Sequence, residues 1–97
     1  MATSPAQVLG DPSTQGDGNI LPANSAPTVT VQGTPIAVVR TVGELHPHGD
    51  SVIPVHPVTG SVTVTAEGFP IHRVGDLRAC GLHQGGPSQN ATVLIGP

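Results

Sequence analysis

Hydrophobic and polar residues alternate with a period of two in short stretches that glycine and proline separate. The alternation is clearest in Thr28-Val29-Thr30-Val31, where small β-forming side chains occupy every position, and this pattern is typical of a strand. Further strands are predicted at 36–42, 51–53, 61–65, 71–74 and 91–95. Because no helical stripe extends beyond about two turns, the pattern predicts an all-β protein.

Part of this pattern occurs twice. The residues from Gly33 to Ile36 recur from Gly68 to Ile71 after a shift of 35 residues, so that a strand-turn-strand hairpin is the repeating unit. The stretch 92–95 resembles the start of a third copy that is cut off by the C-terminus. A lone hairpin is marginally stable. The copies are therefore expected to share one core around a pseudo-axis.

Length and composition limit the class of fold. The chain has 97 residues, including 13 Gly and 11 Pro, and this length corresponds to about one domain. We expect a single domain over 1–97, with a loop-rich part at 1–26 and repeated hairpins at 27–97. Only 9% of the residues are charged, which is unlike a disordered chain. The net charge of −3 and the absence of Trp and Tyr exclude nucleic-acid binding through a basic face or stacked bases.

The five histidines and the single cysteine suggest a metal site. A single cysteine cannot form an intrachain disulfide, and a chain this short often needs a staple. Cys80 and His83 have a spacing that lets a thiolate and an imidazole converge on one ion. His72 lies one strand earlier, and His48 is the repeat equivalent of His83. The predicted ligands are therefore His48, His72, Cys80 and His83. His46 remains an alternative to His48.

Three imidazoles and one thiolate describe a closed, tetrahedral structural zinc site. The sequence thus predicts one zinc ion, and ferrous iron is the second choice. A closed site has no position for a reactive water. Neither a Gly-x-Ser-x-Gly elbow nor a His-Glu-x-x-His motif occurs. The sequence therefore predicts that the protein is not an enzyme, and His56, between two prolines, is interpreted as an ordinary loop residue.

The order of these motifs resembles the PAAR-repeat family. The resemblance rests on Gly-x-Pro-Ile-His-Arg-Val-Gly-Asp at 68–76, on Cys-x-x-His at 80–83, on His-Gly at 48–49 and on Gly-Ser-Val-Thr-Val at 60–64. It extends from about residue 10 to residue 97. Two positions depart from the family pattern. Gln15 stands where a histidine is expected, and the copy at 35–38 lacks the motif's arginine.

The resemblance implies a fold and a set of partners. PAAR-like proteins form a small pointed β-cone with a metal, typically zinc, near the point. The expected fold is such a cone of repeated short hairpins, with approximate threefold pseudo-symmetry. In the family the cone sits as a monomer on the blunt end of a trimeric β-helical spike. Arg73 and Asp76, which flank Gly75, are expected to fix a turn by an ion pair or by backbone hydrogen bonds.

The implied function is that of a structural spike tip. The chain is expected to cap the trimeric spike and to sharpen it for piercing a target-cell membrane, with effector cargo as a further possible partner. The alternative is a small metal-binding adaptor module that recruits effector or cargo to a secretion spike. The location is a phage virion tail tip or the secreted tip of a type VI apparatus, and the sequence leaves the two open. A signal peptide is not expected, because the first residues lack a basic start and an apolar stretch of about 7–15 residues. A transmembrane segment is not expected either, since no apolar stretch approaches about 18 residues.

Overall fold

The computed structural model describes residues 3–14, 19–40, 45–48, 51–54, 56–79, 84–89 and 93–96, with the backbone alone for 45–48 and 51–54. All of its strands are short, and the only helical element among these residues is a single 3-10 turn. The elements are β1 (Ser4–Pro5), η1 (Pro22–Asn24), β2 (Ser25–Val31), β3 (Thr34–Ala37), β4 (Leu45–His48), β5 (Ser51–Pro54), β6 (Thr65–Ala66), β7 (Phe69–Pro70) and β8 (Leu94–Ile95). The predicted all-β class is confirmed, and the short strands are compatible with a small β-cone.

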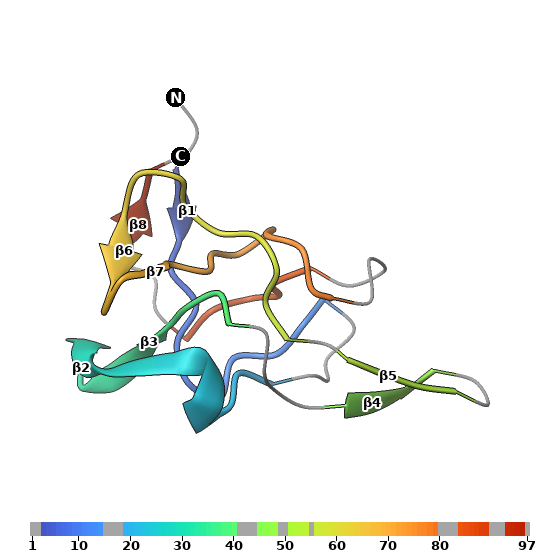
Figure 1. Cartoon of the computed structure of the whole chain (residues 1–97). Helices are drawn as coiled ribbons and strands as arrows, with labels where there is room; N and C mark the ends of the chain where they lie inside the picture. Colours follow the sequence, from blue (N-terminus) through green and yellow to red (C-terminus); the bar gives the residue numbers. More distant parts are fainter. Residues whose placement is uncertain are drawn as a thin grey trace.

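Three of the strand pairs form equivalent antiparallel hairpins. They are β2–β3, β6–β7 and β8–β1, which Figure 1 shows toward one side of the molecule. Each hairpin contains a proline at an equivalent place in its second strand. The paired positions are Thr30 with Pro35, Thr65 with Pro70, and Leu94 with Pro5. The hairpin is therefore the repeating unit, as the sequence predicted.

Two of these hairpins have the turns that the repeat predicted. In the β2–β3 turn, Gln32 has a φ of 52° and Gly33 a φ of 82°; in the β6–β7 turn, Glu67 has 52° and Gly68 has 84°. Two successive residues with positive φ are the signature of a type I′ turn, whose twist matches that of the flanking strands. Glycine at the second position accepts this conformation without a steric penalty.

The third hairpin joins the two ends of the chain. Ser4 pairs with Ile95 and Pro5 with Leu94, and the N–H of Ala6 donates to the carbonyl of Val93 at 3.1 Å. The copy that the sequence analysis expected to be cut off after 92–95 is thus completed by β1, from the segment predicted to be loop-rich. Figure 1 shows β1 and β8 side by side.

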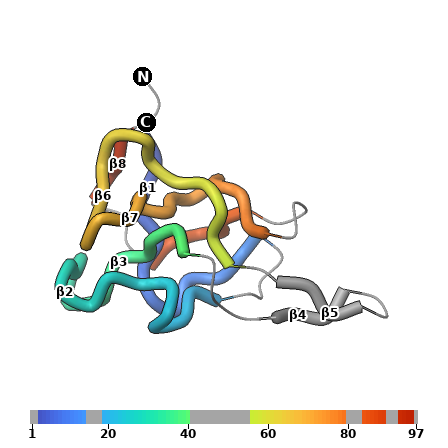
Figure 2. The backbone as a smooth tube through the Cα atoms, in the orientation of Figure 1, coloured from blue at the N-terminus to red at the C-terminus, as the bar shows by residue number. Residues whose placement is uncertain are grey.

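The segments that follow the three prolines pair with one another in a closed triangle. These segments are 5–9, 35–39 and 70–74, and Figure 2 shows them in blue, green and orange. The N–H of Gln7 donates to His72 O (3.0 Å), that of His72 to Ala37 O (3.0 Å), and that of Ala37 to Gln7 O (2.8 Å). A second cycle of three bonds follows the same order. It runs from Leu9 N to Pro35 O, from Val39 N to Pro70 O and from Val74 N to Pro5 O, each at 2.9 Å.

One side of this triangle is apolar. Ala6, Ile36 and Ile71 occupy equivalent positions and are at most 3% exposed, as are Val8 and Val38. They form a single cluster with side chains from the hairpins, namely Ala26, Val31, Ala66 and Ile95, against which Val29, Val64 and Val93 pack. Small aliphatic side chains thus fill this core.

The other side of the triangle is polar. Successive residues of an extended segment point to opposite faces, so the positions between the apolar ones face away from this cluster. They are held by Gln7, Ala37 and His72, each 0% exposed. Two of the three equivalent positions therefore bury a polar side chain, and these side chains need partners inside the protein.

Several predicted elements differ from the structure. The strand predicted at 36–42 is observed at Thr34–Ala37, and the segment 71–74, predicted to be a strand, contains only isolated β-bridges at Ile71 and Arg73. The stretch 44–50 was predicted to be a loop, but Leu45–His48 is a strand that pairs with Ser51–Pro54. The intervening Gly-Asp dipeptide is a sequence signal for a hairpin. The strand predicted at 61–65 is reduced to Thr65–Ala66, because the hydroxyl of Ser61 accepts the N–H groups of Thr63 (3.2 Å) and Val64 (2.9 Å). Such side-chain bonds compete with strand pairing.

Candidate functional site

The predicted metal ligands are only partly within the described residues. Cys80 and His83 lie outside them, as does Gln15, and for His46 and His48 the backbone of β4 is described but the side chains are not. His72 is thus the one predicted ligand whose side chain is described. Within the described part of the chain, no three residues of the types His, Cys, Asp and Glu gather as a metal site. The predicted zinc site stays a prediction.

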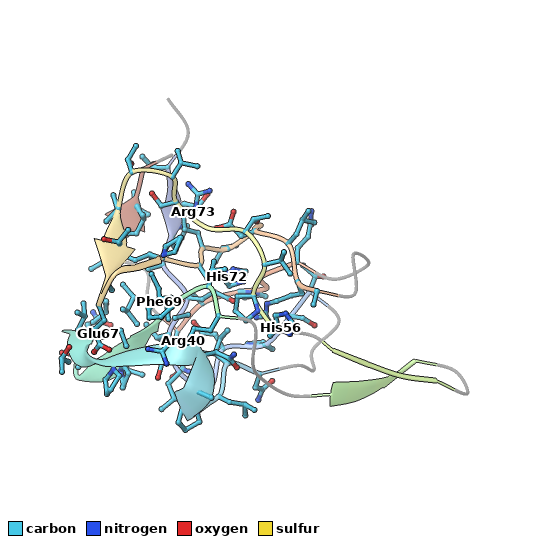
Figure 3. The ribbon with its side chains drawn as sticks, viewed as in Figure 1. Arg40, His56, Glu67, Phe69, His72 and Arg73 are labelled. Carbon is cyan, nitrogen blue, oxygen red and sulfur yellow. The ribbon has the colours of Figure 1, made fainter. Side chains whose placement is uncertain are left out.

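Both ring nitrogens of His72 contact protein groups. Nδ1 lies 2.8 Å from the carbonyl oxygen of Thr59. A carbonyl can only accept, so Nδ1 carries the proton. Nε2 is then the acceptor, and it receives the Nε–H of Arg78 at 3.0 Å. Burial lowers the pKa of His72 to about 4, and the positive charge of Arg78 contributes to the lowering. His72 is therefore a neutral, fully enclosed imidazole at neutral pH, in the centre of the molecule in Figure 3.

Arg78 extends the network to the N-terminal segment. Its side chain is 1% exposed, and its Nη2 donates to Oε1 of Gln7 at 2.7 Å. The amide nitrogen of Gln7 donates in turn to the carbonyls of Pro12 and Gly86, each at 2.9 Å. The orientation of the Gln7 amide is therefore fixed by the two carbonyls and the guanidinium. We call the side chains of Gln7, His72 and Arg78 the buried relay.

Two glycines let the surrounding loops close over the buried relay. A Cβ at Gly85 would lie 2.6 Å from the carbonyl oxygen of Arg73 and 3.0 Å from the side-chain amide of Gln7. A Cβ at Gly86 would lie 2.5 Å from the carbonyl oxygen of Ser13. Real Cβ contacts are longer, so only glycine fits at both positions. This part of the molecule is as closely packed as an apolar core.

The turn at residues 73–76, at the end of the paired segment 70–74, is held by Arg73 and Asp76, as the sequence predicted. Asp76 receives the backbone N–H of Arg73 (2.9 Å) and two guanidinium nitrogens of the same residue (2.8 and 3.0 Å). Burial opposes the charge of Asp76, but the bonds from Arg73 outweigh it and hold the pKa of the carboxyl below its ordinary value. Gly75 has a φ of 91° in this turn. Arg73 also donates to the carbonyl of Gly96 at 2.8 Å and so fastens the end of β8.

An earlier copy of this turn, absent from the sequence predictions, lies at residues 8–11. The N–H of Val8 donates to Oδ2 of Asp11 at 2.8 Å, and Gly10 has a φ of 91°. Ser88 Oγ and Gln89 N donate to the same carboxylate at 2.7 and 3.0 Å. The signal was present as a Gly-Asp dipeptide at both 10–11 and 75–76. The copy is found by aligning the segment around residues 10–11 with the segment around residues 75–76.

A charged cluster joins two of the hairpins. Arg40 lies 3.8 Å from a carboxylate oxygen of Glu67 and 4.3 Å from the ring centre of Phe69. Glu67 accepts both the hydroxyl and the N–H of Thr28, and these bonds lower the pKa of its carboxyl. Figure 3 shows Arg40, Glu67 and Phe69 near the β2–β3 and β6–β7 hairpins. This cluster therefore holds β6–β7 to β2–β3.

Together these features define a small all-β protein in which a triangle of backbone pairings ties three hairpins together, with an apolar core on one side of the triangle and the buried relay on the other. Comparison with family models matches the PAAR motif to residues 9–83 of this chain. This match covers most of the chain, and the protein belongs to the PAAR motif family. Comparisons with curated proteins and with solved structures give no match. The family is structural, and its members are associated with the spike tips of type VI secretion systems and related machines.

Proposed function

We propose that this protein caps a trimeric β-helical spike as a single copy and sharpens it for piercing a membrane. The observation that carries the proposal is the cyclic pairing of 5–9, 35–39 and 70–74, in which each segment donates to one neighbour and accepts from the other. The approximate threefold pseudo-symmetry is part of the proposal, and three similar hairpins around this triangle support it. A monomer with three similar faces can match the three identical chains of a trimer.

The surface that docks on the spike is proposed to be the hairpin side. Here apolar side chains remain in solvent on or next to the hairpin strands, with Val62 86% exposed, Leu94 56% and Phe69 38%. A contiguous exposed apolar patch marks an interaction site, and these three side chains are proposed to belong to one such patch. The ends of a β-helix also present open strand edges that need a cover. A spike trimer satisfies both requirements.

The test is reconstitution with the trimeric β-helical spike protein of the same organism. One copy of this chain per trimer is expected, measured by native mass spectrometry. Val62→Asp should weaken the complex by at least about tenfold, because a charge in a buried contact costs more than 1.4 kcal/mol. Val58→Asp is the matched control, since Val58 is 47% exposed but pairs with Leu77 in a loop. No complex at micromolar concentration, or three copies per trimer, would contradict the proposal.

Zinc is proposed as a structural ion whose ligands come from the predicted set of His48 (or His46), His72, Cys80 and His83. In a small protein a structural zinc ion contributes on the order of 10 kcal/mol of apparent binding free energy. A chelator is therefore expected to lower the melting temperature sharply, and Cys80→Ser should abolish the difference. Unchanged melting together with no stoichiometric metal in elemental analysis would refute zinc. Retained zinc without any binding to the spike would instead favour the adaptor function.

The proposed location is the tip of a phage tail or of a type VI secretion apparatus. Within the described residues, no helix is long and apolar enough to span a bilayer. PAAR proteins sit on spike proteins of such machines. The force for penetration is proposed to come from the contracting machine, with this chain providing a rigid point.

A further inference from the structure

The buried relay bears directly on the predicted set of metal ligands. A histidine binds zinc through the lone pair of an unprotonated ring nitrogen, and its other nitrogen is fixed by a hydrogen bond to a second group. The contact from Nδ1–H of His72 to Thr59 O supplies such a second group. Nε2 is therefore the one ring nitrogen of His72 whose lone pair could meet a metal ion.

That lone pair is already used by a cation. The Nε–H of Arg78 lies 3.0 Å from Nε2, and Arg78 is 1% exposed, so the contact is shielded from water. The guanidinium stays protonated at every pH that proteins tolerate. A zinc ion at Nε2 would have to displace it, and two cations at close range repel strongly where water is excluded. The guanidinium is also anchored to Gln7 Oε1 at 2.7 Å, which opposes its withdrawal.

The surroundings match a guanidinium better than a metal ion. Among the described residues, the groups that contact Arg78 include the neutral nitrogen of His72, the amide oxygen of Gln7 and, at 3.5 Å, the carbonyl of Pro12. Zinc prefers thiolate, imidazole and carboxylate ligands, and a single imidazole is available among these three groups. The equivalent positions of the triangle, Gln7 and Ala37, carry no side chain that binds zinc well.

We infer that the guanidinium of Arg78 takes the place beside His72 Nε2 that a metal ion would need, so that zinc bound by Cys80 and His83 is bound without His72. His72 is then a positioning residue, which holds Arg78 and through it the N-terminal segment. The predicted ligand set loses one imidazole. The inference concerns the interior of the molecule and does not depend on the spike-tip function.

The test uses the whole protein labelled with nitrogen-15, with the ring nitrogens of His72 observed by NMR. Without metal, Nδ1 is expected to be protonated and Nε2 to be a hydrogen-bonded acceptor. Arg78→Met should move the Nε2 resonance toward that of a free lone pair. Arg40→Met is the matched control and should leave it in place, because Arg40 contacts Glu67 and Phe69 instead.

Zinc addition gives the second readout. One equivalent of zinc is expected to leave both His72 ring resonances unchanged. His72→Asn, which keeps a donor for Thr59 O, should alter zinc affinity by less than about twofold, whereas Cys80→Ser should lower it at least about tenfold, as loss of a metal contact does. The free chain and its variants are compared at a temperature where circular dichroism shows each to be folded.

Two results would overturn the inference. One is a large zinc-induced shift of His72 Nε2, and the other is a loss of zinc affinity in His72→Asn as large as in Cys80→Ser. If the wild-type chain takes up no zinc, the zinc proposal fails. The zinc-free spectra then test whether Arg78 occupies the lone pair of His72 Nε2. An unchanged Nε2 resonance in Arg78→Met would then refute the role of Arg78, and a shift confined to that variant would support it.

Discussion

A fully enclosed imidazole and a fully enclosed guanidinium need partners to be tolerated inside so small a protein. Leaving a buried polar group unpaired costs about 1–3 kcal/mol, and more for a charged one. Here His72 and Arg78 satisfy each other, and Gln7 passes the contact on to two backbone carbonyls. The sequence marked His72 as chemically interesting, but residue type and spacing could not show which group its lone pair meets. Nothing in the sequence marked Arg78, because its role depends on Gln7, a residue 71 positions away.

At this scale stability should depend on pH through His72. The pKa of His72 is lowered to about 4 in the folded protein, from an ordinary 6.5. Between these values the unfolded chain binds a proton that the folded chain does not. The contribution of His72 to the free energy of unfolding is therefore fully present above pH 6.5. It is lost as the pH drops toward 4, which lowers the free energy of unfolding by up to about 3 kcal/mol. Urea unfolding at pH 7.5, 5.5 and 4.5, with a chelator in every sample, measures this loss.

The contribution of His72 is isolated by comparing variants. His72→Asn is expected to be less stable at pH 7.5 and to lose less stability on acidification than the wild type does. His56→Asn should keep the wild-type dependence, since only the backbone carbonyl of His56 takes part in a described contact, to Ala79 N at 2.9 Å. Equal pH dependence in the wild type and His72→Asn would show that His72 is not the group responsible.

At the scale of elements, a local pattern sufficed for two hairpins and failed for the third. The Gly-x-Pro-Ile repeat lies within one stretch of chain in β2–β3 and β6–β7, so the strands and turn can be recognised together. In β8–β1 the two strands are the ends of the chain, and no turn connects them. The predicted lengths of the strands were also too long in places, as at 61–65. Side-chain bonds such as those of Ser61 end the pairing early, and alternation alone does not reveal them.

The closing hairpin is expected to matter as much as the two continuous ones. Ile95 occupies the position of Val31 and Ala66 and is 8% exposed within the apolar cluster. Ile95→Ala should lower the free energy of unfolding by about 2–5 kcal/mol through lost burial and the cavity left behind. Its neighbour is the control, because Leu94 is 56% exposed and Leu94→Ala should stay within about 0.5 kcal/mol. Equal effects in denaturant melts would mean that β8 does not close the core.

On the scale of the whole molecule, the three paired segments form a closed ring, although the chain that carries them is linear. The segments 5–9, 35–39 and 70–74 follow one another along the chain, but the last also pairs with the first, and the triangle has no free edge. The sequence could predict a shared core and a pseudo-axis from the repeat at 33–36 and 68–71. It could not predict closure, because the copy at 5–9 keeps little of the repeated pattern beyond its proline and the Gly-Asp turn that follows.

Because the ring is closed, the chain ends can be moved from the β8–β1 pair to a turn of another hairpin without loss of the fold. The protein can be circularly permuted by joining residue 97 to residue 1 through a short linker and opening the exposed turn between Gln32 and Gly33. Because Ser4 and Ile95 are already neighbours across a strand pair, the linker adds little constraint, and exposed turns tolerate new ends. The permutant is expected to unfold cooperatively in a thermal melt and to keep the wild-type pattern of NMR resonances.

The matched control is a second permutant, with the same linker but opened between Ile71 and His72. It places charged chain ends where His72 N donates to Ala37 O and where Gln7 N donates to His72 O, and so interrupts the triangle itself. It should fail to give a cooperative transition. If both permutants fold equally well, the hairpins rather than the triangle hold the molecule together; if neither folds, the pairing of β8 with β1 does not define the closure. Only folding of the first alone identifies the closed triangle as the element that sets the architecture.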